Sequence, residues 1–239
     1  MLVKTKAIVL SKIKYRDNDL IAKCYTQQNG ITSYLIRGVN KKSKGGSKAA
    51  YFQYLTQLII EENYQANRNI QYIKEVRLDN TYSSLHSNLL KSSIAIFIAE
   101  VLAEVLREEE QNLKLYDYLE TSLRWLDIQN NFSNFHLLFL LELSKHLGFY
   151  PDTSQIDLPY FNLSNGAFQN DRDEIYSISN DNISILKRLI GTNFDALETV
   201  QLNSKQRQSF LAVLLLYFEL HLGGFKKPRS LEVFNQVFH

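Results

Sequence analysis

The stretch from Leu20 to Lys48 reads LIAKCYTQQNGITSYLI followed by RGVNKKSKGGSK. Its first part predicts two short strands, Leu20–Gln27 and Ile31–Ile36, with the hairpin signal Asn29-Gly30 between them. Its second part, Arg37–Lys48, holds five basic residues and no acidic one, and its glycines and serines disfavour a helix. Such a segment is most often a solvated loop, but lysines on a glycine-rich backbone also suit contact with phosphate groups.

Three further segments of the N-terminal third predict strands. They are Leu2–Tyr15, Tyr51–Glu61 and Asn69–Leu78, and a β-bulge near Val9–Ser11 explains a break in the alternation of the first. Five short strands and one long loop within residues 1–80 favour a small closed barrel, because closure leaves no exposed strand edge. The five-stranded OB-fold is the candidate architecture, and its usual ligand is single-stranded nucleic acid.

Aromatic side chains in the predicted barrel could stack on bases, although most aromatics in a small barrel fill its core. We expect one or two of them to face a ligand, and the sequence does not show which. The candidates are Tyr15, Tyr25, Tyr34, Tyr51, Phe52 and Tyr54.

Charge is unevenly distributed along the chain. Residues 1–80 hold 14 Lys and Arg against 6 Asp and Glu, whereas residues 81–239 hold 13 against 19. The formal net charge of the whole chain is only +2. A basic segment followed by an acidic one predicts two modules with different partners, the first of which presents a cationic surface.

Helical periodicity replaces strand alternation after about residue 84. The predicted helices span Leu89–Glu109, Leu113–Ile128, Phe132–Leu147, Ile183–Ile190, Lys205–Leu222 and Ser230–Phe238. A polar, turn-rich insert at residues 149–180 interrupts them, and Asn165-Gly166 predicts a hairpin there. The predicted fold class is therefore α+β, with an OB-type barrel in residues 1–80 and a helical domain in residues 81–239.

The sequence lacks the common motifs of enzymatic chemistry, since it contains no GxxxxGK[ST], GxGxxG, HExxH or GxSxG. Its histidines are scattered, and the adjacent carboxylates of Glu108–Glu110 point in different directions on a helix, so neither set predicts a metal site. The single cysteine, Cys24, excludes a disulfide framework or a multi-thiolate zinc site and is expected to be a small strand residue. We therefore expect no enzymatic activity, no metal and no cofactor.

No apolar run is long enough to cross a membrane, since the longest, Phe210–Phe218, falls far short of the ~20 residues required. The N-terminus also lacks the apolar core of a signal peptide. Together with the free thiol, these features predict a soluble, cytoplasmic protein.

Three segments together resemble the RecO family of bacterial recombination mediators. They are TKAIVLSKIKYRDNDLIAKCYTQQNGITSYLIRGVNKKSK, LLFLLELSKHLGFYPD and GGFKKPRSLEVFNQV, similar to the family's barrel, central helical segment and ending. The resemblance implies an N-terminal OB-fold, a C-terminal helical domain, binding of single- and double-stranded DNA, and annealing of complementary strands. It also implies loading of a recombinase onto strands coated by single-strand-binding protein, together with a RecR partner. Many relatives carry a four-cysteine zinc site after the central segment, but residues 149–180 here contain no cysteine, so we expect no zinc.

The resemblance places the DNA contacts largely in the basic barrel. The predicted DNA-binding residues are Lys23, Arg37, Lys41, Lys42, Lys44 and Lys48, of which Arg37 and the lysines after it lie in a matching motif. The acidic tail of the single-strand-binding protein needs a basic pocket, for which we predict Lys226, Lys227 and Arg229, although solvated helix ends are the alternative. A rival hypothesis is a scaffold whose barrel binds RNA or ribosomes, because charge alone does not distinguish these ligands from DNA.

Overall fold

The computed structural model describes residues 2–39, 48–106 and 111–238 of the 239-residue chain, with the backbone alone at Lys48. Internal contacts divide the chain into two compact units. The first is Met1–Ile128 with Pro228–Phe234, and the second is Gln129–Lys227 with Asn235–His239. The barrel and the first two helices thus belong to one unit.

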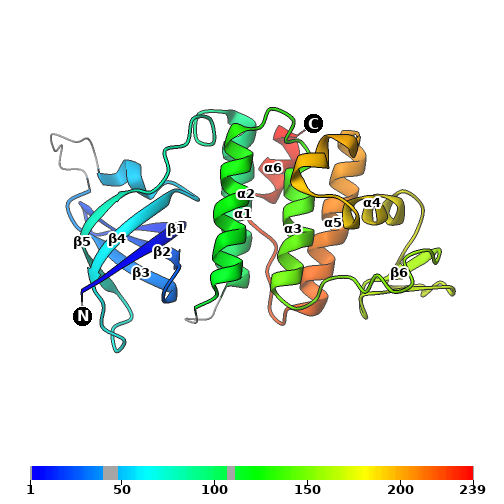
Figure 1. The fold of residues 1–239 in the computed structure, drawn as a ribbon, viewed down its shortest axis with the longest axis horizontal. Helices are drawn as coiled ribbons and strands as arrows, with labels where there is room; N and C mark the ends of the chain where they lie inside the picture. The colour runs from blue at the N-terminus through cyan, green and yellow to red at the C-terminus, as the bar shows by residue number, and fades with distance from the viewer. Residues whose placement is uncertain (1, 40–47, 107–110, 239) are drawn as a thin grey trace. The chain divides into compact units, whose positions relative to one another are not determined.

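A closed barrel opens the first unit (Figure 1). Its strands are β1 (Leu2–Tyr15), β2 (Asp19–Thr26), β3 (Gly30–Ile36), β4 (Gln57–Asn63) and β5 (Gln71–Leu78). They close in the order β1-β2-β3-β5-β4, with β3 and β5 parallel and all other neighbours antiparallel. The predicted fold class, an OB-type barrel followed by a helical region, is confirmed.

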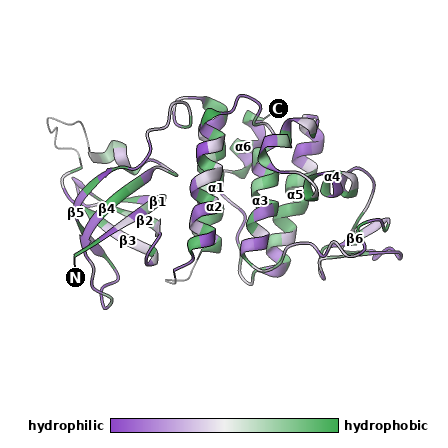
Figure 2. Cartoon of the chain, in the orientation of Figure 1, coloured by the Kyte–Doolittle hydropathy of each residue, from purple (hydrophilic) through white to green (hydrophobic). Residues whose placement is uncertain are grey.

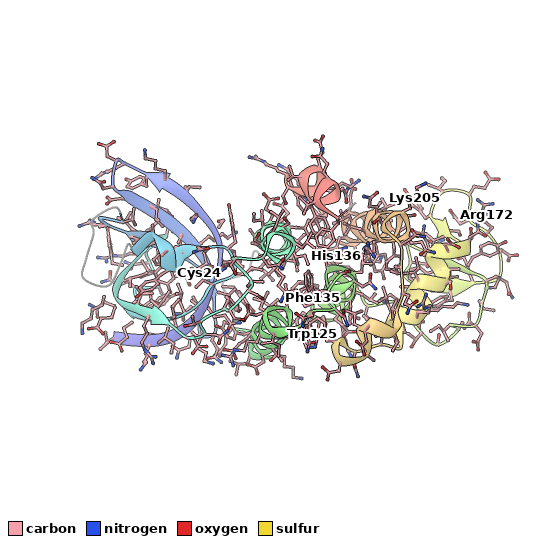
Figure 3. The ribbon with its side chains drawn as sticks, turned by 90° about the horizontal axis from the view of Figure 1, so that it is seen from above. Cys24, Trp125, Phe135, His136, Arg172 and Lys205 are labelled. Atoms are coloured by element: carbon pink, nitrogen blue, oxygen red, sulfur yellow. The ribbon has the colours of Figure 1, made fainter. Side chains whose placement is uncertain are left out.

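Strand alternation builds the barrel core. In β3, Thr32, Tyr34 and Ile36 are buried while the residues between them are partly exposed. Cys24 of β2 is fully buried inside the barrel (Figure 3). The register between β1 and β2 shifts between Val9 and Ser11, which confirms the predicted bulge. Figure 2 shows hydrophobic and hydrophilic residues interspersed along the strands and helices, as expected for elements with one buried face.

The predicted strand Tyr51–Glu61 is wrong in its first half. Lys48–Phe52 form a 3-10 helix, η1, and β4 begins only at Gln57. The physical reason is burial, because η1 places Phe52 fully inside the barrel core, where removal of the ring from water is favourable. Leu55 then takes a left-handed φ of 61°, and its backbone N–H donates to the carbonyl of Val9 at 2.7 Å, which redirects the chain into β4.

Helices α1 (Leu89–Val105) and α2 (Leu113–Ile128) belong to the same unit as the barrel. Asn88 caps α1 by accepting hydrogen bonds from the first backbone N–H groups of the helix. The bounds of α2 are those predicted, whereas α1 ends before the predicted Glu109, because Leu106 has an extended backbone.

A buried carboxylate joins α2 to the linker between the barrel and α1. Asp127 is 5% exposed and accepts backbone N–H bonds from Ser83, Ser84 and Leu85 at 2.8–2.9 Å, together with the Ser83 hydroxyl. The buried Lys91 donates to the Asp127 carbonyl and to the Ser84 hydroxyl, both at 2.7 Å. These contacts explain why the compact unit continues past the barrel to the end of α2.

The second unit is built on helices. They are α3 (Phe135–His146), α4 (Asn180–Ile190), the 3-10 helix η2 (Phe194–Thr199), which was not predicted, and α5 (Ser204–His221). Helix α3 is buried almost all round, as its apolar sequence predicts, and Phe135 and His136, both labelled in Figure 3, are among its buried residues. It begins later than the predicted Phe132, directly after Asn134. Residues of α6 (Leu231–Val237) are divided between the two units.

The insert at residues 149–180 contains a small sheet of β6 (Tyr160–Asn162), β7 (Ala167–Gln169) and β8 (Ser177–Ile178). The antiparallel pair β6–β7 confirms the hairpin predicted at Asn165-Gly166, while β8 was not predicted. Across the parts of the chain that the structure describes, no helix combines the length and the apolar character needed to span a membrane.

Aromatic packing holds this insert on α5. The Tyr217 hydroxyl donates to the Phe149 carbonyl at 2.8 Å, and the His221 ring stacks on Phe149 with centroids 5.3 Å apart. Gly166 has a φ of +69°, and a Cβ there would lie 2.6 Å from the Tyr217 hydroxyl oxygen, so only glycine fits. Residues 149–180 contain no cysteine, and the described residues show no group of three or more His, Cys, Asp and Glu suited to a metal. The insert therefore does not fit a four-cysteine zinc site.

Candidate nucleic-acid interface

A row of apolar side chains crosses the outer surface of the barrel. Ile13 of β1 pairs with Ile21 of β2, Ile21 pairs with Leu35 of β3, and Leu35 pairs with Tyr72 of β5. The chain neighbours of Ile21 and Leu35 belong to the barrel core, as Ala22 and Ile36 show, so strand alternation turns these two side chains outward. Ile13 is 62% exposed and Tyr72 is 44% exposed, with the two middle residues partly covered. We call these four residues the outer row.

Two arginines accompany the aromatic end of the outer row. The guanidinium carbon of Arg37 lies 5.4 Å from the centroid of the Tyr72 ring, and that of Arg68 lies 5.6 Å from it. Both arginines are exposed. This arrangement places two permanent positive charges beside an exposed aromatic ring, a combination suited to an unpaired nucleotide.

Backbone contacts fix the start of the predicted loop beside the β1–β2 turn. The Gly38 N–H donates to the Asp19 carboxylate at 3.0 Å, and the Val39 N–H donates to the Asn18 carbonyl at 2.8 Å. The guanidinium of Arg16 in the same turn lies 5.2 Å from the centroid of the exposed Tyr15 ring. Lys12 and Lys14 near this turn are exposed as well. The loop start and the turn therefore lie at the same end of the barrel.

The predicted DNA-binding residues have different surroundings. Arg37 is exposed beside Tyr72. Lys23 is partly buried, and its ammonium donates to the Ala103 carbonyl at 3.0 Å in the last turn of α1, where the helix dipole favours a cation. Lys41, Lys42 and Lys44 lie outside the described residues, as does the side chain of Lys48, whose backbone begins η1.

Part of the positive charge of the barrel is neutralised within the first unit. The Lys6 ammonium lies 2.7 Å from a Glu120 carboxylate oxygen and 3.5 Å from Asp79. Arg124 of α2 pairs with both carboxylates, at 3.0 Å to Asp79 and 3.1 Å to Glu120. The hydrogen bond that Lys6 donates to the Glu120 carboxylate raises the pKa of Lys6 despite partial burial, so Lys6 serves the contact between barrel and helix.

Three of the six aromatics named as stacking candidates are buried, while Tyr51 and Tyr54 are partly exposed. Tyr25, Tyr34 and Phe52 are at most 3% exposed, and burial raises the pKa of Tyr25 to about 12. Tyr15 is the candidate that is clearly exposed, at 39%. Sequence reasoning missed Tyr72, because its position beside Leu35 depends on the parallel pairing of β3 with β5.

The predicted partner-binding residues Lys226, Lys227 and Arg229 are all exposed. Lys227 lies 3.6 Å from a Glu219 carboxylate oxygen, a surface ion pair that contributes little to stability. The division between the compact units falls between Lys227 and Pro228, so these residues do not belong to one unit.

Comparisons with known proteins agree with this architecture. Residues 1–82 match the family described as Recombination protein O N terminal, and residues 86–231 match Recombination protein O C terminal. DNA repair protein RecO of Christiangramia forsetii is 46% identical over 238 residues, and that of Flavobacterium psychrophilum is 43% identical over 238 residues. DNA repair protein RecO of Bacteroides fragilis is 35% identical over 242 residues, and each alignment covers 100% of both chains. The chain belongs to the RecO family.

Proposed function

We propose that this chain binds single- and double-stranded DNA through its barrel and anneals complementary strands during repair and recombination. The observation that carries the proposal is the exposed outer row of the barrel, with Arg37 and Arg68 beside Tyr72. The relatives named DNA repair protein RecO support DNA as the polyanion.

Charge neutralisation is the proposed mechanism of annealing. Two DNA strands repel each other through their phosphates, and a surface of Arg and Lys side chains that binds both strands reduces this repulsion and releases counterions. Arg37 lies at the start of the predicted lysine loop, so the described cations and Lys41, Lys42 and Lys44 would extend one phosphate-binding surface. We propose that annealing requires neither nucleotide hydrolysis nor a cofactor and takes place in the cytoplasm.

A salt titration tests this interface. Each lysine that contacts single-stranded DNA contributes about 0.7 to the slope of log affinity against log salt. Changing Lys41, Lys42 and Lys44 to Ala should therefore lower that slope by about 2 and weaken binding. The matched control replaces three exposed lysines of the helices, Lys114, Lys145 and Lys205, the last labelled in Figure 3.

An unchanged slope in the loop variant would show that the loop does not contact the DNA. An equal decrease of the slope in the control variant would show that only the net charge of the protein matters. Competition with structured RNA at the same salt concentration tests the rival function. Stronger binding of RNA than of single-stranded DNA would favour the RNA- or ribosome-binding scaffold.

We further propose that the chain helps to load a recombinase onto strands coated by single-strand-binding protein, together with a RecR-type partner. The acidic tail of the single-strand-binding protein is the proposed ligand of Lys226, Lys227 and Arg229, which are exposed cations. Changing all three to Ala should abolish capture of a tail peptide at low salt, and full retention would exclude these residues. The same variant should keep its affinity for single-stranded DNA, which separates tail binding from DNA binding.

A further inference from the structure

We propose that Tyr72 is a stacking platform for one unpaired base and that it makes the barrel prefer single strands over duplex. This inference rests on the proposed DNA-binding function, because it names the form of DNA that the same surface selects. The residues that carry it are Tyr72, Arg37 and Arg68.

Tyr72 is more exposed than Tyr34, the aromatic residue of the adjacent strand β3. Tyr34 also lies at the β3–β5 pairing but is fully buried, and its hydroxyl donates to Glu62. Tyr72 points away from the core and keeps 44% of its surface in solvent. An aromatic ring held on a closed barrel loses little conformational entropy when a base stacks on it.

The two arginines beside the Tyr72 ring can bind the phosphate of the nucleotide whose base stacks on that ring. At 5.4 Å and 5.6 Å from the ring centroid, both guanidinium groups lie near the outer limit of about 6 Å for a cation–π contact. Such exposed contacts are weaker than the stacking of a base on an aromatic ring. A base can therefore displace a guanidinium from the ring, and the displaced arginine remains within reach of the backbone phosphate.

The proposed preference for single strands over duplex follows from the accessibility of the base faces. Bases in a duplex are already stacked on each other and paired, so their faces do not reach a ring on the barrel surface. The arginines bind phosphates of either form, whereas the ring contributes only when the base is unpaired. Because the outer row offers one ring among three aliphatic side chains, it holds one base and leaves the neighbouring bases of the strand free to pair.

The test compares the full chain with its Tyr72→Leu and Tyr72→Phe variants. Binding is measured by fluorescence anisotropy at one salt concentration with a single-stranded oligonucleotide, the matching duplex, and an abasic strand of equal length and charge. Tyr72→Leu should weaken binding of the single strand between about 5-fold and 150-fold, the range expected for loss of one base–aromatic stack. It should change binding of the duplex and the abasic strand by less than 2-fold, while Tyr72→Phe should retain binding of the single strand.

The outcomes separate this inference from the proposed function. If the unaltered protein binds the abasic strand as tightly as the normal strand, or if Tyr72→Leu weakens all three ligands equally, the stacking platform is refuted while DNA binding stands. If the unaltered protein binds none of the three, the proposed function itself fails. Thermal melting of each variant detects a general loss of folding. Tyr160→Leu is the matched control, because it removes a partly exposed tyrosine of β6 and should leave binding of all three ligands unchanged.

Discussion

Removing the Asp127 carboxylate should destabilise the first unit much more than removing the exposed Asp117 carboxylate of the same helix. Its two oxygens accept backbone N–H groups from three consecutive residues, Ser83, Ser84 and Leu85. Asp127→Ala leaves these donors without their acceptor, and a buried unsatisfied donor costs about 1–3 kcal/mol. Because only the Leu85 bond is fully buried and the other two bonds are partly buried, we expect a total loss of about 2–4 kcal/mol.

Urea and thermal unfolding measure this loss. For a chain of this size, 1 kcal/mol shifts the melting temperature by about 2–4 °C, so Asp127→Ala should melt roughly 4–16 °C lower. Asp117→Ala is the matched control, because Asp117 is an exposed carboxylate on the same helix. If the two variants unfold within about 0.5 kcal/mol of each other, the linker does not depend on this carboxylate and the reasoning is refuted.

The pH dependence provides a second readout for Asp127. Burial raises the pKa of its carboxyl, but the backbone hydrogen bonds from Ser83, Ser84 and Leu85 outweigh burial and hold the pKa below its ordinary value. A depressed pKa stabilises the folded state above the pKa of the unfolded chain, near 3.9, and this stabilisation is lost as pH falls through the folded value. The stability difference between the unaltered protein and Asp127→Asn should therefore be constant near neutral pH and shrink below about pH 4.

Two further predictions concern the barrel. Glu62 is fully buried, one of its oxygens accepts from Tyr34, the other has no hydrogen-bond partner among the described residues, and burial raises the pKa of this carboxyl. Because the folded protein holds that proton to a higher pH than the unfolded chain, wild-type stability should fall as pH rises from about 4.5 through the folded pKa. Glu62→Gln should therefore be more stable than the unaltered protein at pH 8 but not at pH 4, and an advantage equal at both would contradict this. Lys23→Met should lose about 1 kcal/mol of stability with its bond to the Ala103 carbonyl and leave the salt slope of DNA binding unchanged, whereas a slope lowered by about 0.7 would assign Lys23 to the DNA.

Local patterns were sufficient to predict most of the fold. The interrupted alternation at Val9–Ser11 correctly predicted a register shift. The Asn29-Gly30 pair correctly predicted the turn between β2 and β3, where Gly30 has a φ of 60°. Helix α2 follows its apolar stripe over the predicted bounds. Each of these features depends on residues close together in the sequence, which is why one sequence suffices.

Features that depend on distant residues were not predictable. The contact between Lys23 and Ala103 joins residues 80 apart, and Asp127 reaches a linker more than 40 residues away. Tyr72 becomes part of an exposed row only through the parallel pairing of β5 with β3, which no short-range signal specifies. Lys41, Lys42 and Lys44 were predicted from composition and family resemblance and remain a prediction, because they lie outside the described residues.

A strand-annealing assay tests the central claim most directly. Complementary oligonucleotides are mixed at fixed salt with the unaltered protein or with a variant in which Arg37, Lys41, Lys42 and Lys44 are changed to Ala. The unaltered protein should anneal the strands well above the spontaneous rate, and the variant should fall back toward that rate while melting at the same temperature. Equal annealing by both proteins, or no acceleration by the unaltered protein, would contradict the account.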